Sequence, residues 1–197
     1  MPATPQPNAA IARRGRVAPG ISAPLLSALI LAAGLAWTAD AGAQQPPTLP
    51  GGASSLAETY GDWRVACRIA GTARSCSMMQ QQVRQDGQRV VTIELQTAPG
   101  NALAGSLVLP FGLDLAAGAT LRIDEQPAGA PLPFRTCLPS GCEARVGFDA
   151  KTITALRAGT KLQITTKTAD SAQDFAIAIS LNGFTAAADR LKAISGQ

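Results

Sequence analysis

Four cysteines are the residues most able to do chemistry in this chain. They are Cys67, Cys76, Cys137 and Cys142, and the 197-residue sequence contains no histidine. The lack of histidine excludes Ser-His-Asp catalysis, Cys-His catalysis and histidine-ligated metals. The cysteines could therefore act as nucleophiles, bind zinc as four thiolates, or form disulfides.

The spacing of the cysteines favours disulfides. Eight residues separate the first pair and four separate the second, which fits a zinc knuckle poorly, and the chain contains neither a Cys-x-x-Cys motif nor a Gly-rich phosphate loop. An even number of cysteines in an exported chain indicates disulfides. Of the three possible pairings we favour the local one, Cys67–Cys76 with Cys137–Cys142, because each pair brackets a short segment with turn residues. We expect no catalytic residue, no metal and no cofactor.

Carboxylates are the remaining groups for acid–base chemistry. A pair of them could hydrolyse an envelope polymer, but the sequence places no two at a catalytic separation. Each also suits a solvent-facing position on a strand or turn, as in any soluble domain. The candidates are Glu94, Asp114, Asp124, Glu125, Glu143 and Asp149. A carboxylate enzyme is therefore the alternative to a chain without catalysis.

Several side chains near the first predicted strand could instead contact a partner. Arg64 and Arg68 lie on its polar face, where they could hold an anionic envelope component or simply be solvated. Met78 and Met79 could mark a partner surface, although filling the core is the more common role of methionine. Trp63 fits a core or sheet-edge anchor better than a ligand stacker.

The N-terminal segment has the three parts of a secretory signal peptide. Arg13–Arg16 contains three arginines, Leu25–Ala36 is an apolar run of twelve residues, and Ala41–Ala43 offers small residues for cleavage. A membrane-spanning helix needs about twenty apolar residues, so an anchor is disfavoured. We therefore expect residues 1–43 to be removed and the protein to be periplasmic or secreted.

Loss of this segment changes the charge of the working protein. Residues 1–43 hold three arginines and one aspartate, so the net charge falls from +4 to +2. No dense cluster of Lys and Arg with interleaved aromatics is left, which argues against nucleic-acid binding. The Arg13-Arg14 pair hints at twin-arginine export, but the residues after it favour the general secretory route.

Periodicity along the rest of the chain predicts a β-rich domain. Residues 44–59 are rich in Pro, Gly and Ser and predict a flexible linker, and residues 60–197 predict a single domain. Alternating apolar and polar residues predict about eight or nine strands. These strands are residues 63–69, 75–83, 89–97, 106–109, 119–124, 131–137, 142–148, 161–168 and 174–181. Asp149 could cap a short helical turn, and apolar residues from Phe184 recur at helical spacing. The expected fold is mainly β, an antiparallel β-sandwich or partly closed barrel with a C-terminal helix and two disulfides.

Four short motifs lie along residues 60–192. They are Gly61-Asp62-Trp63-Arg64-Val65-x-Cys67 with Cys76-x-Met78, Leu109-Pro110-Phe111-Gly112-Leu113-Asp114, Phe134-Arg135-Thr136-Cys137-Leu138-Pro139-x-Gly141-Cys142, and Ser180-Leu181-x-Gly183-Phe184-Thr185. This set resembles the invasion-associated locus B family. The resemblance implies a secreted or periplasmic protein of alphaproteobacteria or their relatives, a family whose founding member is associated with invasion of host cells. It carries over no catalytic residue.

Three functions are open on these observations. We favour an exported, non-catalytic envelope protein that binds a host surface or another envelope component. The alternatives are a periplasmic enzyme that acts through carboxylates and a structural or stress-protective periplasmic protein. We expect no nucleic-acid partner and no stable membrane span after cleavage of the signal.

Overall fold

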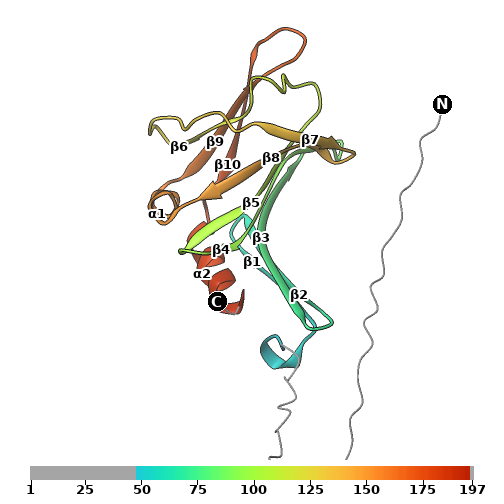
Figure 1. Ribbon diagram of the computed structural model, residues 1–197, viewed down its shortest axis with the longest axis vertical. Helices are drawn as coiled ribbons and strands as arrows, with labels where there is room; N and C mark the ends of the chain where they lie inside the picture. Colours follow the sequence, from blue (N-terminus) through green and yellow to red (C-terminus); the bar gives the residue numbers. More distant parts are fainter. Residues whose placement is uncertain (1–47, 196–197) are drawn as a thin grey trace, which may run out of the picture. The chain divides into compact units, whose positions relative to one another are not determined.

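The structure, a computed structural model, describes residues 48–195, which lie within one compact unit (Figure 1). These residues form a seven-stranded sheet, a three-stranded sheet, two α-helices and a short 3-10 helix at Pro50–Gly52. The predicted signal peptide, residues 1–43, lies outside the described residues. None of the described helices is both long and apolar enough to cross a membrane.

All strand pairs in the two sheets are antiparallel. In spatial order, the large sheet contains β1 (Ser55–Tyr60), β2 (Trp63–Ala70), β3 (Ala73–Val83), β4 (Arg89–Ala98), β5 (Ala102–Leu109), β8 (Gly141–Phe148) and β7 (Phe134–Leu138). The small sheet contains β10 (Asp174–Ser180), β9 (Lys161–Lys167) and β6 (Thr120–Ile123). The helices are α1 (Ala150–Ala158) and α2 (Phe184–Ser195). This arrangement confirms the expected mainly β, sandwich-like fold with a C-terminal helix and two disulfides.

The alternation predicted from the sequence buries one face of the large sheet. On β2, Trp63, Val65 and Cys67 are buried, whereas Arg64 and Arg68 are exposed. Helix α2 packs against β1 to β4 on the buried face, and Figure 1 shows α2 and the small sheet on the same side of the large sheet. Burial of this apolar face is the main driving force for the sandwich.

Side-chain amides join the two sheets at the edge of β10. The Gln80 side chain, 4% exposed, donates from Nε2 to the Ser180 carbonyl at 2.9 Å and accepts from the Ser180 N–H at 3.1 Å. The Trp63 Nε1 donates to the same carbonyl at 3.0 Å, and the Gln82 Nε2 donates to the Ala178 carbonyl at 2.8 Å. These amides therefore occupy part of the edge of β10, which would otherwise present unpaired backbone groups.

The prediction of a flexible linker at residues 44–59 is wrong for the second half of that segment. Residues 55–60 form β1, which pairs with β2, and the Ser54 carbonyl accepts a hydrogen bond from the Ile69 N–H at 2.8 Å. Leu49, in the same predicted linker, is 2% exposed. The error has a physical cause: backbone pairing with β2 recruits this edge strand, which has only a weak apolar pattern of its own.

The junction at Ser180 predicts a measurable loss of stability. We expect Gln80→Met, which keeps the volume but removes both hydrogen bonds, to lower the free energy of unfolding by about 2 kcal/mol, because the Ser180 N–H loses its partner. Gln81→Met, on the exposed neighbour, should change it by less than about 0.5 kcal/mol. Urea denaturation of both variants measures the difference. Equal midpoints would show that the amide pairing contributes nothing.

Candidate functional site

The four cysteines form two cross-strand disulfides in the structure. Cys67 on β2 is bonded to its register partner Cys76 on β3, and Cys137 on β7 is bonded to its register partner Cys142 on β8. The sequence separations are nine and five residues. Bridged sulfurs are neither nucleophiles nor thiolate ligands, so in this arrangement the cysteines are structural.

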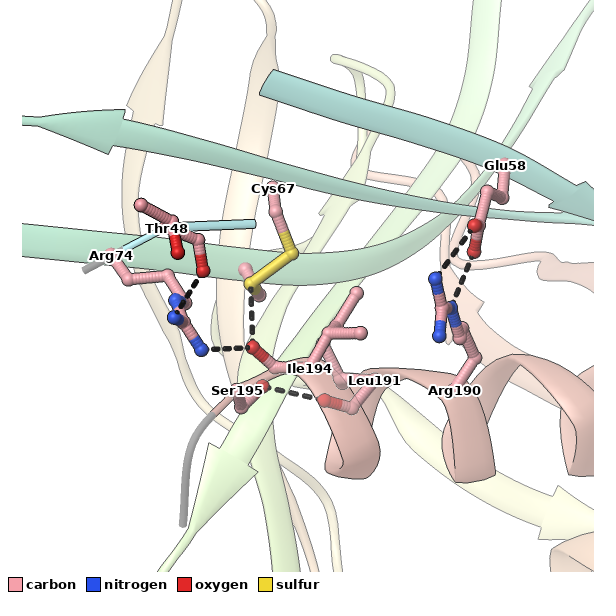
Figure 2. The surroundings of a disulfide bond; sticks show 9 residues. Thr48, Glu58, Cys67, Arg74, Arg190, Leu191, Ile194 and Ser195 are labelled. Carbon is pink, nitrogen blue, oxygen red and sulfur yellow. Dashed lines mark hydrogen bonds and ion pairs between the residues drawn. A yellow bond between two sulfur atoms is a disulfide. The ribbon is translucent and has the colours of Figure 1, made fainter. Parts of the chain in front are cut away.

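The Cys67–Cys76 disulfide lies beside the end of α2 (Figure 2). The Cys76 Sγ is 3.8 Å from the Ile194 carbonyl oxygen, which also accepts a 3.0 Å hydrogen bond from the Arg74 Nη1. The Arg74 Nη2 donates to the Thr48 carbonyl at 2.6 Å. A cation at a helix C-terminus is favourable because the last carbonyls carry partial negative charge. Arg74 therefore fastens α2 and the start of the described chain to β3.

An ion pair fastens α2 to β1 (Figure 2). The Arg190 Nε and Nη2 donate to the two carboxylate oxygens of Glu58 at 2.7 and 2.8 Å, and the Tyr60 hydroxyl donates to Glu58 at 2.9 Å. The hydrogen bond from Arg190 is the main cause that lowers the pKa of Glu58. A bidentate pair of this kind fixes the geometry of both side chains. Glu58 is thus a positioning group for the helix.

Two of the predicted carboxylates hold turns in place. Asp124 accepts hydrogen bonds from the hydroxyl and backbone N–H of Thr160 and from the Lys161 N–H, and these bonds, led by the Thr160 hydroxyl, lower its pKa. Asp149 accepts from the Thr152 N–H at 2.7 Å as the N-cap of α1, and hydrogen bonding by the Thr152 side chain, followed by that of its N–H, lowers the pKa of Asp149. A general acid needs a raised pKa to keep its proton, so neither suits that role.

The other predicted carboxylates are spread over the molecule. Asp114 accepts from the Ala116 N–H at 2.9 Å within its own loop. Glu125 forms ion pairs at 3.5 to 3.6 Å, and Glu143 pairs with Arg145 at 3.4 Å. Within residues 48–195, no three acidic or cysteine side chains converge as metal ligands would. Among the predicted acids, Glu94 lies in the same row of paired strand residues as two other candidates, Arg64 and Met79.

A row of paired residues crosses the polar face of the large sheet. Arg64 is the register partner of Met79, Met79 of Glu94, Glu94 of Ser106, and Ser106 of Arg145. A shallow depression of about 280 Å³ lies over Glu94, Ser106 and Arg145. The sequence placed Arg64 and Glu94 on polar faces but did not show that strand order brings them into one row. Arg68 lies four residues, or two pleat repeats, further along β2 than Arg64, and Met78 lies on the opposite, buried face.

Exposed apolar side chains gather at one end of the large sheet. Val83, Phe111 and Leu138 are 55%, 61% and 48% exposed. Val83 ends β3, Phe111 follows the end of β5 by two residues, and Leu138 ends β7, all at the same end of the sheet (Figure 1). We call this surface the hairpin end and define it as Val83, Arg84, Arg89, Phe111 and Leu138. Single exposed apolar residues are normal, whereas several at one edge make this end a candidate interaction surface.

A larger concave region lies between the β4–β5 turn and the two helices, and its volume is about 440 Å³. The charged side chains that line it form contacts within the protein. Both of its cations have partners: Arg157 pairs with Asp189 at 2.6 Å, and Lys192 donates to the Asn101 side-chain oxygen at 2.8 Å. The hydrogen bond to Arg157 lowers the pKa of Asp189. This region therefore presents no unpartnered charge to a ligand among the residues described.

Comparisons with known proteins place these features in a family context. The family model described as Invasion associated locus B (IalB) protein matches residues 63–192. The Invasion protein B homolog of Brucella abortus (strain 2308) is 50% identical over 149 residues, which cover 75% of this chain and 86% of the relative. Invasion protein B of Bartonella bacilliformis is 32% identical, with coverage of 75% and 80%. The crystal structure of invasion associated protein b from Bartonella henselae is similar at 33% identity with a TM-score of 0.66, covering 70% of this chain and 95% of that one.

The two disulfides should differ in their response to a reductant. Cys137 is exposed although its partner Cys142 is 3% exposed, whereas both Cys67 and Cys76 are buried, at 4% and 8% exposed. We expect mild reduction to open Cys137–Cys142 first, and differential alkylation with peptide mass mapping to report the order. Each bridge should stabilise by about 2–3 kcal/mol in the chain-entropy model. Peptides that join Cys67 to Cys137 or Cys142 in the unreduced protein would contradict the pairing.

The Glu58–Arg190 pair predicts a pH-dependent stability difference. The pKa of Glu58 is lowered on folding from its ordinary value of 4.5, so its stabilisation is present above that value and is lost as the pH falls through the folded pKa. We expect Glu58→Gln to be less stable than the parent at neutral pH and equal to it in acid, as measured by thermal unfolding across pH. Arg190→Gln should behave the same way, and the double variant should add little. If the double variant lost as much stability as the two single variants together, Glu58 and Arg190 would not be coupled.

Proposed function

This chain belongs to the invasion-associated locus B family, and we propose that it is an exported, non-catalytic envelope protein that binds a partner through the hairpin end. The observation that carries the proposal is the exposure of Val83, Phe111 and Leu138 at one end of the large sheet; the fourth large apolar side chain that is exposed among the described residues, Leu115, lies in the loop that follows Phe111. Several exposed apolar groups at one end of a sheet are a cost unless something covers them. We infer that a host surface or another envelope component covers them.

The proposal that the protein is not an enzyme rests on its candidate acids. Asp124 and Asp149 are held by hydrogen bonds that keep them ionised, and Asp114 is held within its own loop. The polar depression over Glu94 offers a carboxylate and an arginine, but Glu143, the second acid near it, is paired with that arginine. This weakens the case for two free carboxylates at a catalytic distance.

Export is proposed from the N-terminal segment. The basic region, the apolar run and the small residues at 41–43 form the pattern of a secretory signal, and the cysteine pairs suit an oxidising compartment. We place the working protein in the periplasm or outside the cell. In either place its partners would be envelope or surface components.

Site-specific crosslinking in native envelopes tests the proposal. A photoreactive phenylalanine analogue at Phe111 or Leu138 should give adducts, because both side chains point out of the sandwich at the proposed contact. The matched control is the same analogue at Gln81 or Gln96, which are exposed on the polar strand faces. Mass spectrometry identifies what is attached. Equal adducts at all four positions, or none at the hairpin end, would end the proposal.

A further inference from the structure

We propose that the hairpin end binds a membrane surface that carries anionic lipid headgroups. This inference rests on the proposed function, because it names the class of partner for the same surface. The supporting observations are the place of the three apolar side chains at one end of the sheet, the arginines beside them, and the spacing between them.

Strand register brings two of the three apolar side chains to nearly one level. Met79 and Arg145 belong to the single row that crosses the sheet. Val83 lies four residues from Met79 along β3, and Leu138 pairs with Gly141, which lies four residues from Arg145 along β8. At about 3.4 Å per residue, Val83 and Leu138 therefore lie roughly 14 Å from the row. Phe111 lies in a bend two residues past the end of β5, which places the third apolar tip at the same end of the sheet.

Positive charge accompanies these tips. Arg84 and Arg89 flank the turn that follows Val83; both are exposed, and neither forms an ion pair among the described residues. The nearby acid Asp86 caps the same turn by accepting from the Gln88 N–H at 2.9 Å. The turn thus carries a net positive charge. Arginine suits this position because its apolar stem can lie along lipid while its guanidinium binds phosphate oxygens.

The spacing of the tips favours a lipid surface over a protein groove. Two strand intervals separate Val83 from Phe111, and two more separate Phe111 from Leu138, so neighbouring tips are roughly 10 Å apart. Polar turn residues lie between them, so they do not form the continuous apolar centre of a protein interface. A bilayer interface can accept separate anchors, and its anionic headgroups attract the arginines. The result should be weak, reversible, peripheral binding.

Vesicle flotation of the purified protein tests the inference. The protein should float with vesicles of phosphatidylcholine and phosphatidylglycerol in equal parts and stay in solution with phosphatidylcholine alone. Arg84→Gln with Arg89→Gln should lower partitioning about 25-fold, since each arginine near an anionic surface contributes roughly fivefold. Phe111→Ser with Leu138→Ser should lower it about tenfold through lost apolar burial. The matched control, Arg64→Gln with Arg68→Gln, removes the same charge from the polar sheet face and should change it less than about twofold, because its sites lie beyond the screening length.

A spectroscopic readout separates binding from misfolding of a variant. In the chain without residues 1–43, which contain Trp37, Phe111→Trp should emit at shorter wavelength when anionic vesicles are added, whereas the buried Trp63 contributes a constant background. No flotation of the parent protein, or equal losses for the hairpin-end and control arginine pairs, would overturn the lipid inference. Protein adducts at Phe111 without vesicle binding would overturn it and leave the proposed function standing. The absence of both would end the two together.

Discussion

The backbone of Ser180 takes part in three of the hydrogen bonds that join the two sheets. Its N–H and carbonyl both pair with the Gln80 amide, and its carbonyl also accepts from Trp63. A buried amide without partners is costly, so Gln80 commits β3 to the edge of β10. The chain then turns through Gly183 (φ +85°), where a Cβ would overlap the Tyr60 carbonyl, and enters α2 with Phe184 against Trp63. The position of α2 thus follows from the same junction.

The junction also explains why the free surface of the molecule lies where it does. Trp63 and the Gln80 amide occupy the buried face of the large sheet, and Arg74 and Arg190 fasten α2 across it. What is left uncovered is the polar face and the strand ends beyond Val83 and Leu138. The disulfide at Cys137–Cys142 holds β7 to β8 directly beneath Leu138. Leu138 is therefore presented by a hairpin that the disulfide closes, whereas Phe111 lies in the chain that follows β5.

Period-2 alternation predicted most strands because apolar phase and burial agree along them, as in Trp63, Val65 and Cys67. It missed β1, whose pairing with β2 supplies what its own pattern lacks. It also passed over Gln80 and Gln82, although they share the phase of the buried Cys76 and Met78, and polar residues in an apolar phase are the signal of a buried hydrogen-bonding role. The hairpin end could not be predicted from the sequence, because its residues are far apart along the chain and only the order of the strands in the sheet brings them to one end.

The short reach of both disulfides has a consequence for how the protein is made. Each bridge closes a single hairpin between register partners, nine and five residues apart, while any crossed pairing would span at least 61 residues, from Cys76 to Cys137. Low contact order makes the correct bonds the fastest to form, since closing a short loop costs little entropy. Each hairpin can oxidise as soon as it emerges, before the sandwich exists. Short loop closure thus favours the native pairing over either crossed one from the start of folding.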